Sequence, residues 1–187
     1  MRVTGGTARG IQILSPSGKA VRPTTDRVRS ALFNILSAKG VDGLAVVDFY
    51  AGTGSVGIEA LSRGASSVEF VEFDRKQAAD ILKNVSLAKV SERAVIHCTD
   101  VFSALDLLKG PFDLVLMDPP YSDPFPSQLL NKIYSKGFVH SDSVVVVGHS
   151  SREPAPLSCG ALSLSQDRRY GDSGLAFYLD NQVRRAN

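Results

Sequence analysis

The residues best suited to chemistry in this chain are Asp118-Pro119-Pro120-Tyr121. They follow residues 112–117, a short and mostly apolar run that we expect to form a buried strand. Two consecutive prolines lack N–H groups and have fixed φ angles, so the chain must leave the sheet at this point. The motif therefore puts a carboxylate, backbone carbonyls and an aromatic ring at the carboxyl end of a strand, where open α/β sheets bind ligands. Hydrogen-bond acceptors beside a ring suit a planar base that carries an exocyclic amino group.

A glycine-rich loop upstream has the sequence context of a nucleotide-binding turn. The apolar run at residues 44–49 leads through this loop into a helical pattern. Glycines spaced as G-x-G-x-x-G between a strand and a helix allow a tight turn and a close approach of ligand to backbone. The residues that we expect to contact a cofactor here are Asp48, Ala51, Gly52, Thr53, Gly54 and Gly57.

The acids around this loop decide which cofactor it would bind. Alone, the glycine pattern is weak and predicts a nicotinamide dinucleotide. Asp48, however, precedes the first glycine by four residues, where a carboxylate would repel a pyrophosphate but could hold an ammonium group or a water molecule. Glu72 ends the next predicted strand, about 20 residues past the glycines, which is the spacing expected of an acid that binds ribose hydroxyl groups.

Three more residues at strand ends are candidate cofactor contacts. Phe73 could pack on an adenine ring or belong to the core. Asp100, followed by Val101, comes after the strand predicted at 94–98 and could lie near the adenine amino group or only cap a helix. Acids after four successive strands suit a cofactor that has an adenosine and no phosphates, and S-adenosylmethionine fits that description. Asp118, the acid after the fourth of these strands, is therefore also an expected cofactor contact.

Together, the Asp48-to-Gly54 loop and the Asp118-to-Tyr121 motif resemble class I S-adenosylmethionine-dependent methyltransferases that act on exocyclic amino groups. More specific blocks, at residues 2–6, 9–10, 22–29, 32–36 and 57–65, resemble the RsmD family. The resemblance runs from Arg2 to about Tyr121 and continues more loosely to Leu179. Enzymes of this family methylate N2 of one guanine in 16S ribosomal RNA, so the resemblance implies this substrate, which we expect to be held within a small-subunit particle.

The chain departs from the family pattern at three positions. Tyr50 stands where the family usually has Phe, and Thr53 where it usually has Ser. Gly148 follows a predicted strand at a position where many members have Glu. We expect any role of that acid to be absent here or taken by a neighbour such as His149.

The tetrad of Asp118 to Tyr121 would carry the methyl transfer. Guanine N2 is a poor nucleophile whose N–H groups become more acidic as it attacks, so acceptors aimed at it stabilise the transition state. Our hypothesis is that the Asp118 carboxylate and the Pro119 carbonyl are these acceptors, that Pro120 helps to fix the turn and that Tyr121 stacks on the base. The alternatives are that Asp118 caps the following helix and that Tyr121 is a core ring.

The charge of the chain is uneven. Of the formal net charge of +2, residues 1–29 contribute +5, so the remainder carries −3. A basic arm beside a base-modifying site predicts contacts with RNA phosphates. The candidate contacts are Arg2, Arg9, Arg22, Arg27 and Arg29. One of these arginines could instead pair with Asp26 or Glu59.

Composition and length exclude several classes of protein. No segment approaches the roughly 20 apolar residues of a membrane span, and the polar N-terminus is unlike a signal peptide. Cys98 and Cys159 have no metal or redox spacing, so we expect two reduced and largely buried thiols. His97, His140 and His149 have no ligand spacing, and no metal is expected. These features predict a cytoplasmic protein, and the lack of an extended apolar surface segment predicts a monomer.

The expected fold class is α/β: a Rossmann-like class I methyltransferase with a doubly wound, mostly parallel seven-stranded sheet and a C-terminal antiparallel hairpin. This domain would span residues 41–187, after an extension at 1–40 that holds a small β-hairpin and a helix. Strands are predicted near 44–49, 67–72, 94–98, 112–117, 142–147, 162–166 and 175–179. Helices are predicted near 27–39, 57–63, 74–88, 100–108 and 125–136.

Two other functions stay open on the sequence alone. The tetrad also permits an amino-methyltransferase that acts on adenine N6 of DNA or RNA, or on a small molecule. A non-catalytic RNA-binding module for assembly is the third alternative, although the complete set of acids and glycines argues against a decayed site.

Overall fold

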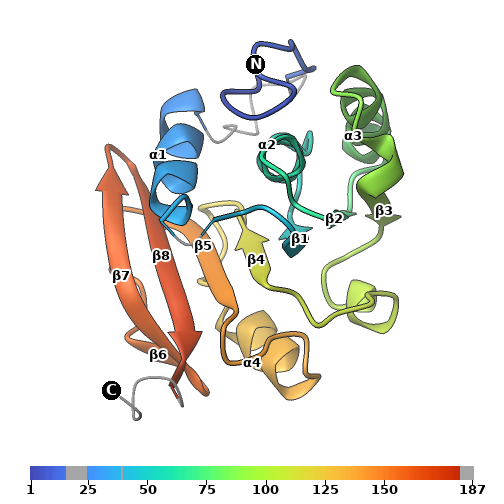
Figure 1. Ribbon diagram of the computed structural model, residues 1–187. Helices are drawn as coiled ribbons and strands as arrows, with labels where there is room; N and C mark the ends of the chain where they lie inside the picture. Colours follow the sequence, from blue (N-terminus) through green and yellow to red (C-terminus); the bar gives the residue numbers. More distant parts are fainter. Residues whose placement is uncertain (16–24, 39, 182–187) are drawn as a thin grey trace.

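One eight-stranded sheet forms the centre of the computed structural model, which describes residues 1–15, 25–38 and 40–181 (Figure 1). The strand order is β3-β2-β1-β4-β5-β8-β7-β6. The strands are β1 Ala45–Phe49, β2 Ser67–Glu72, β3 Ala94–Cys98, β4 Leu114–Met117, β5 Val144–Ser150, β6 Ser158–Cys159, β7 Leu162–Tyr170 and β8 Ser173–Asp180. The first five are parallel, and β8, β7 and β6 continue the sheet antiparallel. The predicted sheet is therefore confirmed, with the short strand β6 added.

The helices in the described ranges are α1 Asp26–Leu36, α2 Ser55–Ser62, α3 Arg75–Leu87 and α4 Ser127–Ser135, with the 3-10 turns η1 Ser91–Arg93 and η2 Ser103–Asp106. The side chain of Thr25 accepts from the Val28 N–H at the start of α1, and Asp74 caps α3 in the same way. Gly40, at φ +81°, turns the chain away after α1. None of these helices is long and apolar enough to cross a bilayer.

The helix predicted at residues 100–108 is only the short turn η2. Asp100 Oδ1 accepts from the N–H groups of both Phe102 and Ser103, each at 3.0 Å. Such local hydrogen bonds favour a tight turn over a regular α-helix. The prediction of a helix over this whole range was therefore wrong, although the buried Ala104 and Leu105 still cover the sheet there.

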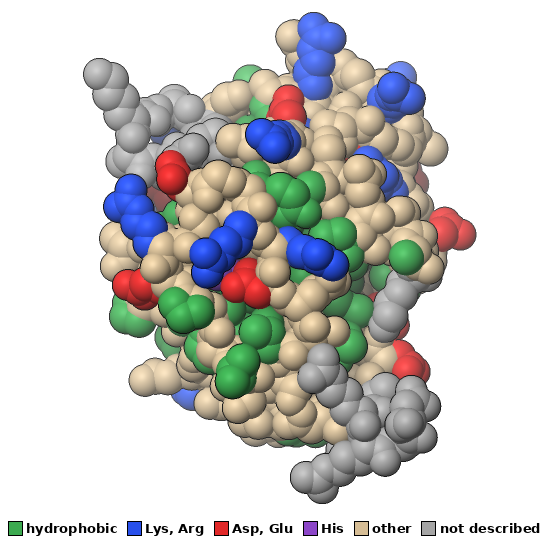
Figure 2. Space-filling view, turned by 90° about the vertical axis from the view of Figure 1, so that its left-hand side faces the viewer, with side chains coloured by type: hydrophobic (Ala, Val, Ile, Leu, Met, Phe, Trp, Pro, Cys, Tyr) green, Lys and Arg blue, Asp and Glu red, His purple; other side chains and the backbone are tan. Residues whose placement is uncertain are grey.

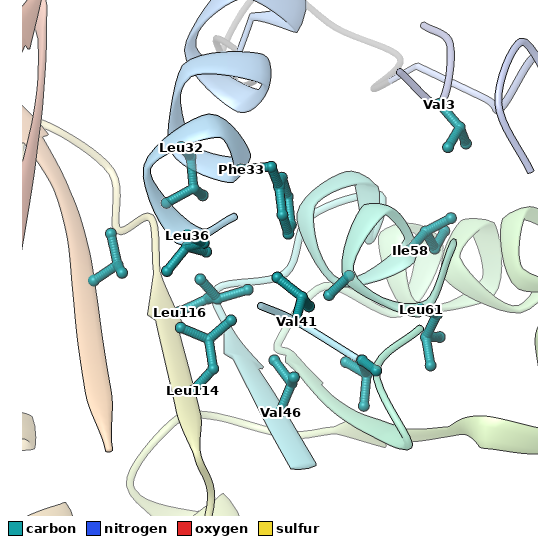
Figure 3. Packing of buried hydrophobic residues seen from close by; sticks show 14 of the residues in the cluster. Val3, Leu32, Phe33, Leu36, Val41, Val46, Ile58, Leu61, Leu114 and Leu116 are labelled. Carbon is teal, nitrogen blue, oxygen red and sulfur yellow. The ribbon is translucent and has the colours of Figure 1, made fainter. Parts of the chain in front are cut away.

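Two layers of helices cover the sheet. Figure 1 shows α1, α2 and α3 on one face and α4 on the other. Alternate residues of β1 and β4 point to opposite faces, so Val46 packs under the first layer while Val47 packs under the second. Figure 3 shows Leu32 and Phe33 of α1 packed above Leu116 of β4. Both faces are buried, as expected for parallel strands rich in Val and Leu.

The N-terminal segment is a β-hairpin reduced to a single bridge. Arg2 pairs with Gln12, and the bonds from Val3 N–H to the Ile11 carbonyl (3.1 Å) and from Gly10 N–H to the Val3 carbonyl (2.9 Å) close it. Its apolar side chains join the same core as α1 and the sheet. The division of the chain near residue 40 stays a prediction.

The two cysteines differ from each other in exposure. Cys159 is buried, as expected, but Cys98 is exposed. The prediction of two largely buried thiols was therefore wrong for Cys98, because it ends β3, which lies at the edge of the sheet.

Candidate active site

Left-handed residues shape the loop between β1 and α2. Gly52 and Gly54 have φ angles of +59° and +77°, which L side chains rarely adopt. The Gly54 N–H donates to the Ala51 carbonyl at 2.7 Å, and the Ala51 N–H donates to a carbonyl of β2 at 3.0 Å. A β-carbon at Gly57 would run into the ring of Phe70, so this glycine allows α2 to pack closely on the sheet. One of these hydrogen bonds stabilises the predicted turn, and the other connects it to β2.

Asp48 lies buried beneath this loop. Its Oδ2 accepts a hydrogen bond from the Gly57 N–H at 2.9 Å, and only 3% of the residue is exposed. Burial raises the pKa of this carboxyl from 3.8 to about 8, and the charges of Asp118 and Glu72 act in the same direction. The carboxyl therefore binds a proton more tightly than an exposed aspartate does, and a nearby cation would favour its ionised form.

Glu72 ends β2 with both carboxylate oxygens held by backbone donors. Its Oε2 accepts from the Gly52 N–H at 2.7 Å, and its Oε1 accepts from the Asp74 N–H at 2.8 Å. The residue is buried, and burial raises the pKa of its carboxyl, while these backbone hydrogen bonds oppose the rise. The glycine loop and the start of α3 thus fix the carboxylate beside a cleft.

A cleft of about 700 Å³ opens at the carboxyl ends of β1, β2 and β4. Pockets of roughly 300–1,000 Å³ suit small ligands and cofactors. The predicted site residues that line the cleft are Gly52, Glu72, Phe73, Asp100, Val101, Asp118, Pro119, Pro120 and Tyr121. The other predicted cofactor contacts lie behind this lining: Asp48 and Thr53 are buried, and Ala51, Gly54 and Gly57 form the turn.

Phe73 and Tyr121 present their rings to this cleft instead of to the core. Phe73 is 77% exposed and Tyr121 is 42% exposed, which excludes the core alternative for both. Asp100 caps the turn η2 and also borders the cleft, so its contact with the adenine amino group stays a prediction. The hydrogen bonds from Ser103 lower the pKa of the Asp100 carboxyl, so it is ionised at neutral pH.

The tetrad lies between the cleft and two smaller hollows. Asp118 and Tyr121 also border a hollow of about 20 Å³ that reaches Asp48, and Tyr121 borders another of about 50 Å³. The second hollow is lined by the two prolines and by Phe125, Gly148, His149 and Glu153, among others. The tetrad can therefore face ligands on two sides, one in the large cleft and one in the outer hollow.

A family model described as conserved hypothetical protein 95 matches residues 1–179. The chain belongs to this family, the RsmD family. It is 30% identical over 178 residues to ribosomal RNA small subunit methyltransferase D of Escherichia coli K12, covering 95% of this chain and 89% of that protein.

Solved structures share the fold. A hypothetical protein of Thermus thermophilus superposes with a TM-score of 0.81 at 28% identity, over 95% of this chain and 98% of that one. An RNA methyltransferase from Salinibacter ruber, solved with S-adenosyl-L-homocysteine, superposes with a TM-score of 0.67 at 16% identity, over 85% and 94% of the two chains. The latter likeness supports the Rossmann-like fold alone.

His149 does not replace the acid that many RsmD-family chains have at position 148. Its Nδ1 lies 2.9 Å from the Ser150 carbonyl, and its Nε2 lies 3.0 Å from the Asp167 carboxylate. Both ring nitrogens are thus engaged away from Asp118. A β-carbon at Gly148 would fall on Asp118 Oδ1, so the absent side chain leaves room for this carboxylate.

The predicted arginine contacts fall into three groups in this RsmD-family chain. Arg2, Arg9 and Arg27 are exposed, and Arg22 lies outside the described residues. Arg29 is completely buried, so its prediction as an RNA contact was wrong. Figure 2 shows the face that carries α1 and β7, where Lys and Arg side chains are dispersed among acidic and hydrophobic ones.

Arg29 belongs to a buried ion-pair network that anchors the N-terminal hairpin. Its Nε lies 3.4 Å from Glu59 Oε2, and Arg63 binds the same carboxylate at 2.9 Å. Thr4 donates to Glu59 through its N–H and its hydroxyl, each at 2.7 Å. Arg29 also donates to the Arg2 carbonyl. The pairing with Asp26 or Glu59 that the sequence left open is thus made with both acids.

Five residues that line the cleft were not predicted as site residues: Tyr50, Val71, Asp74, Gln77 and Ser122. Tyr50 has a φ of +57°, which is unusual for a residue other than glycine, and it lines the cleft beside Glu72. Gln77, in the first turn of α3, also lines it. Its position five residues past Glu72 was a weak signal, because a Gln in the first turn of a helix does not by itself mark a site.

Proposed function

We propose that this protein methylates the exocyclic N2 of a guanine in 16S ribosomal RNA, using S-adenosylmethionine. The observation that carries the proposal is the position of the Asp118-to-Tyr121 tetrad, between a cleft of cofactor size and a smaller outer hollow. Family membership and the name of the Escherichia coli relative support ribosomal RNA as the substrate.

The cleft residues fit the chemistry of this cofactor. Glu72 offers carboxylate oxygens to ribose hydroxyls, and Phe73 offers an exposed ring to adenine. Asp100 offers an acceptor to the adenine amino group. Burial raises the pKa of Asp48. An ammonium group of the cofactor nearby would favour the ionised carboxylate and so oppose this rise. The carboxylates of Asp100 and Asp118, which line the cleft, would repel a pyrophosphate, and this disfavours a dinucleotide.

The protein groups have to align the guanine and stabilise developing charge. When bound, S-adenosylmethionine supplies a methyl group already activated on a sulfonium. Asp118 and the Pro119 carbonyl accept hydrogen bonds from guanine N2, whose N–H groups become more acidic as the nitrogen attacks. Tyr121 stacks on the base and holds its plane, and Pro120 keeps the turn rigid. The released proton passes to Asp118 or to water after transfer.

The substrate base must leave its stack to reach this site. Specific RNA readers usually bind exposed loop bases, and enzymes that modify bases extrude them. Arg2, Arg9 and Arg27 are exposed and would contact phosphates around the target. A chain of 187 residues has limited surface for reading a sequence, which favours a pre-shaped RNA within a small-subunit particle. The lack of an extended apolar segment in the sequence favours a monomeric enzyme.

The test is methyl transfer from labelled S-adenosylmethionine to small-subunit particles and to naked 16S RNA, both from cells that lack this gene. Nucleosides from the product are then separated and identified. The expected label is in N2-methylguanosine, with the Asp118→Ala protein as the matched control that binds cofactor but transfers little. Label in N6-methyladenosine would replace the proposed target with adenine, and cofactor binding without transfer to any RNA would refute the substrate class.

A further inference from the structure

Gln77 carries a buried polar atom that is unexplained in the ligand-free protein. Its backbone N–H donates to Asp74 Oδ1 at 2.8 Å, which fixes the first turn of α3. Its side-chain Oε1 is buried and has no hydrogen-bond partner in the part of the chain that the structure describes. Buried acceptors without a partner are rare because they lose their water without compensation. This atom therefore calls for a partner that the described residues do not supply.

The place of this oxygen points to a ligand in the cleft. Gln77 lines the cleft together with Glu72 and Phe73. Its Oε1 lies 3.4 Å from the position that a β-carbon would take at Gly52, so it packs over the glycine loop. The Gly52 N–H in turn donates to Glu72. The amide of Gln77 and the carboxylate of Glu72 therefore flank one glycine on the same wall.

Two adjacent acceptors suit a ligand with two adjacent donors. Each oxygen of Glu72 already accepts one backbone hydrogen bond and keeps further acceptor capacity. Gln77 lines the same cleft, and its amide adds a neutral acceptor when it turns toward the ligand. A vicinal diol presents two neighbouring hydroxyl donors, whereas a phosphate has none and would meet the Glu72 charge.

We propose that Gln77 binds one ribose hydroxyl of the cofactor while Glu72 binds the other. This inference rests on the proposed use of S-adenosylmethionine and assigns a specificity-determining contact within it. A hydroxyl group both donates and accepts, so it satisfies the Gln77 amide in either orientation. Gln77 is thus a positioning residue that holds the nucleoside end of the cofactor.

The test compares the wild type with Gln77→Met, which keeps the length of the side chain and removes its amide. Affinity for S-adenosylhomocysteine is measured by calorimetry, and the thermal midpoint of the ligand-free protein is measured in parallel. We expect affinity to fall about tenfold, as for loss of one good buried hydrogen bond. The ligand-free midpoint should stay unchanged or rise, because an unpartnered buried oxygen is removed. Lys76→Met, at the exposed neighbouring position, should keep wild-type affinity.

Deoxy forms of the ligand identify the contact. The 2′-deoxy and 3′-deoxy forms of S-adenosylhomocysteine are titrated into both proteins. For the form that lacks the Gln77-bound hydroxyl, wild type and Gln77→Met should bind equally, while the other form should keep the tenfold difference. Equal affinity of both proteins for the complete ligand overturns the Gln77 contact alone. A tenfold difference between the two proteins that persists with both deoxy forms also overturns the Gln77 contact. If the wild type does not bind S-adenosylhomocysteine at all, the proposed use of S-adenosylmethionine is refuted as well.

Discussion

Gly148 lies so close to Asp118 that a β-carbon at position 148 would overlap the carboxylate oxygen Oδ1. Gly148→Ala should therefore displace the Asp118 side chain, although Gly148 itself does not line the cofactor cleft. Displacement of a reacting group by about 1 Å can cost on the order of 100-fold in rate. We expect turnover to fall by about this factor and affinity for S-adenosylhomocysteine to fall much less, because Asp118 is one of many residues that line the cleft. Wild-type turnover in this variant would show that the Asp118 position is not critical.

Asp118 itself should matter for transfer more than for cofactor binding. Loss of one preorganised group at a site of developing charge typically costs about 100- to 1,000-fold in turnover. Asp118→Ala removes both acceptor oxygens, whereas Asp118→Asn keeps one at the same reach. We expect turnover to decrease in the order wild type, Asn variant, Ala variant, as measured under single-turnover conditions. Equal rates for the two variants would argue against a hydrogen-bond role for this side chain.

The parts of the site that could be predicted are those set by local sequence. Glu72 and Asp118 each end an apolar run, and the carboxyl ends of parallel strands meet at one edge of the sheet. Their convergence on one cleft follows from topology. The glycines at 52 and 54 were equally predictable because their positive φ angles are a local requirement of the turn.

The parts that could not be predicted depend on partners distant in the sequence. Arg29 is basic and lies in a basic segment, so charge alone indicated an RNA contact. Only the fold brings Glu59, 30 residues away, to 3.4 Å from it. Likewise, nothing local marks the burial of the Gln77 oxygen, which arises where α3 packs over the glycine loop.

Asp48 should make the stability of the ligand-free protein depend on pH. Its carboxyl has a pKa of about 8 in the folded state against 3.8 ordinarily, so the native state binds the proton more tightly. The free energy of unfolding should therefore fall as pH rises from about 4 to about 8 and level off above that range. Asp48→Asn cannot titrate and should lose most of this slope. Urea unfolding of both proteins between pH 5 and pH 9 measures it, and parallel curves would contradict the raised pKa.

Arg27 and Arg29, two residues apart on α1, should respond to alanine in opposite ways. Arg29 is completely buried and paired with the buried Glu59, so Arg29→Ala should lower the free energy of unfolding by about 3–5 kcal/mol. Arg27 is exposed, and Arg27→Ala should change stability by less than about 0.5 kcal/mol. Urea unfolding measures both values. Similar losses in the two variants would contradict the burial of Arg29.

For RNA binding we expect the opposite pattern: Arg27→Ala should change the affinity and its salt dependence, and Arg29→Ala should not. If Arg27 contacts a phosphate, Arg27→Ala should weaken binding to small-subunit RNA and reduce the slope of log affinity against log salt by about 1. Arg29→Ala, assayed at a temperature where it stays folded, should keep the wild-type slope because its guanidinium faces Glu59 and not solvent. Titrations at several salt concentrations measure both slopes. An unchanged slope in Arg27→Ala would remove this residue from the RNA interface, and a reduced slope in Arg29→Ala would mean that its guanidinium leaves Glu59 when RNA binds.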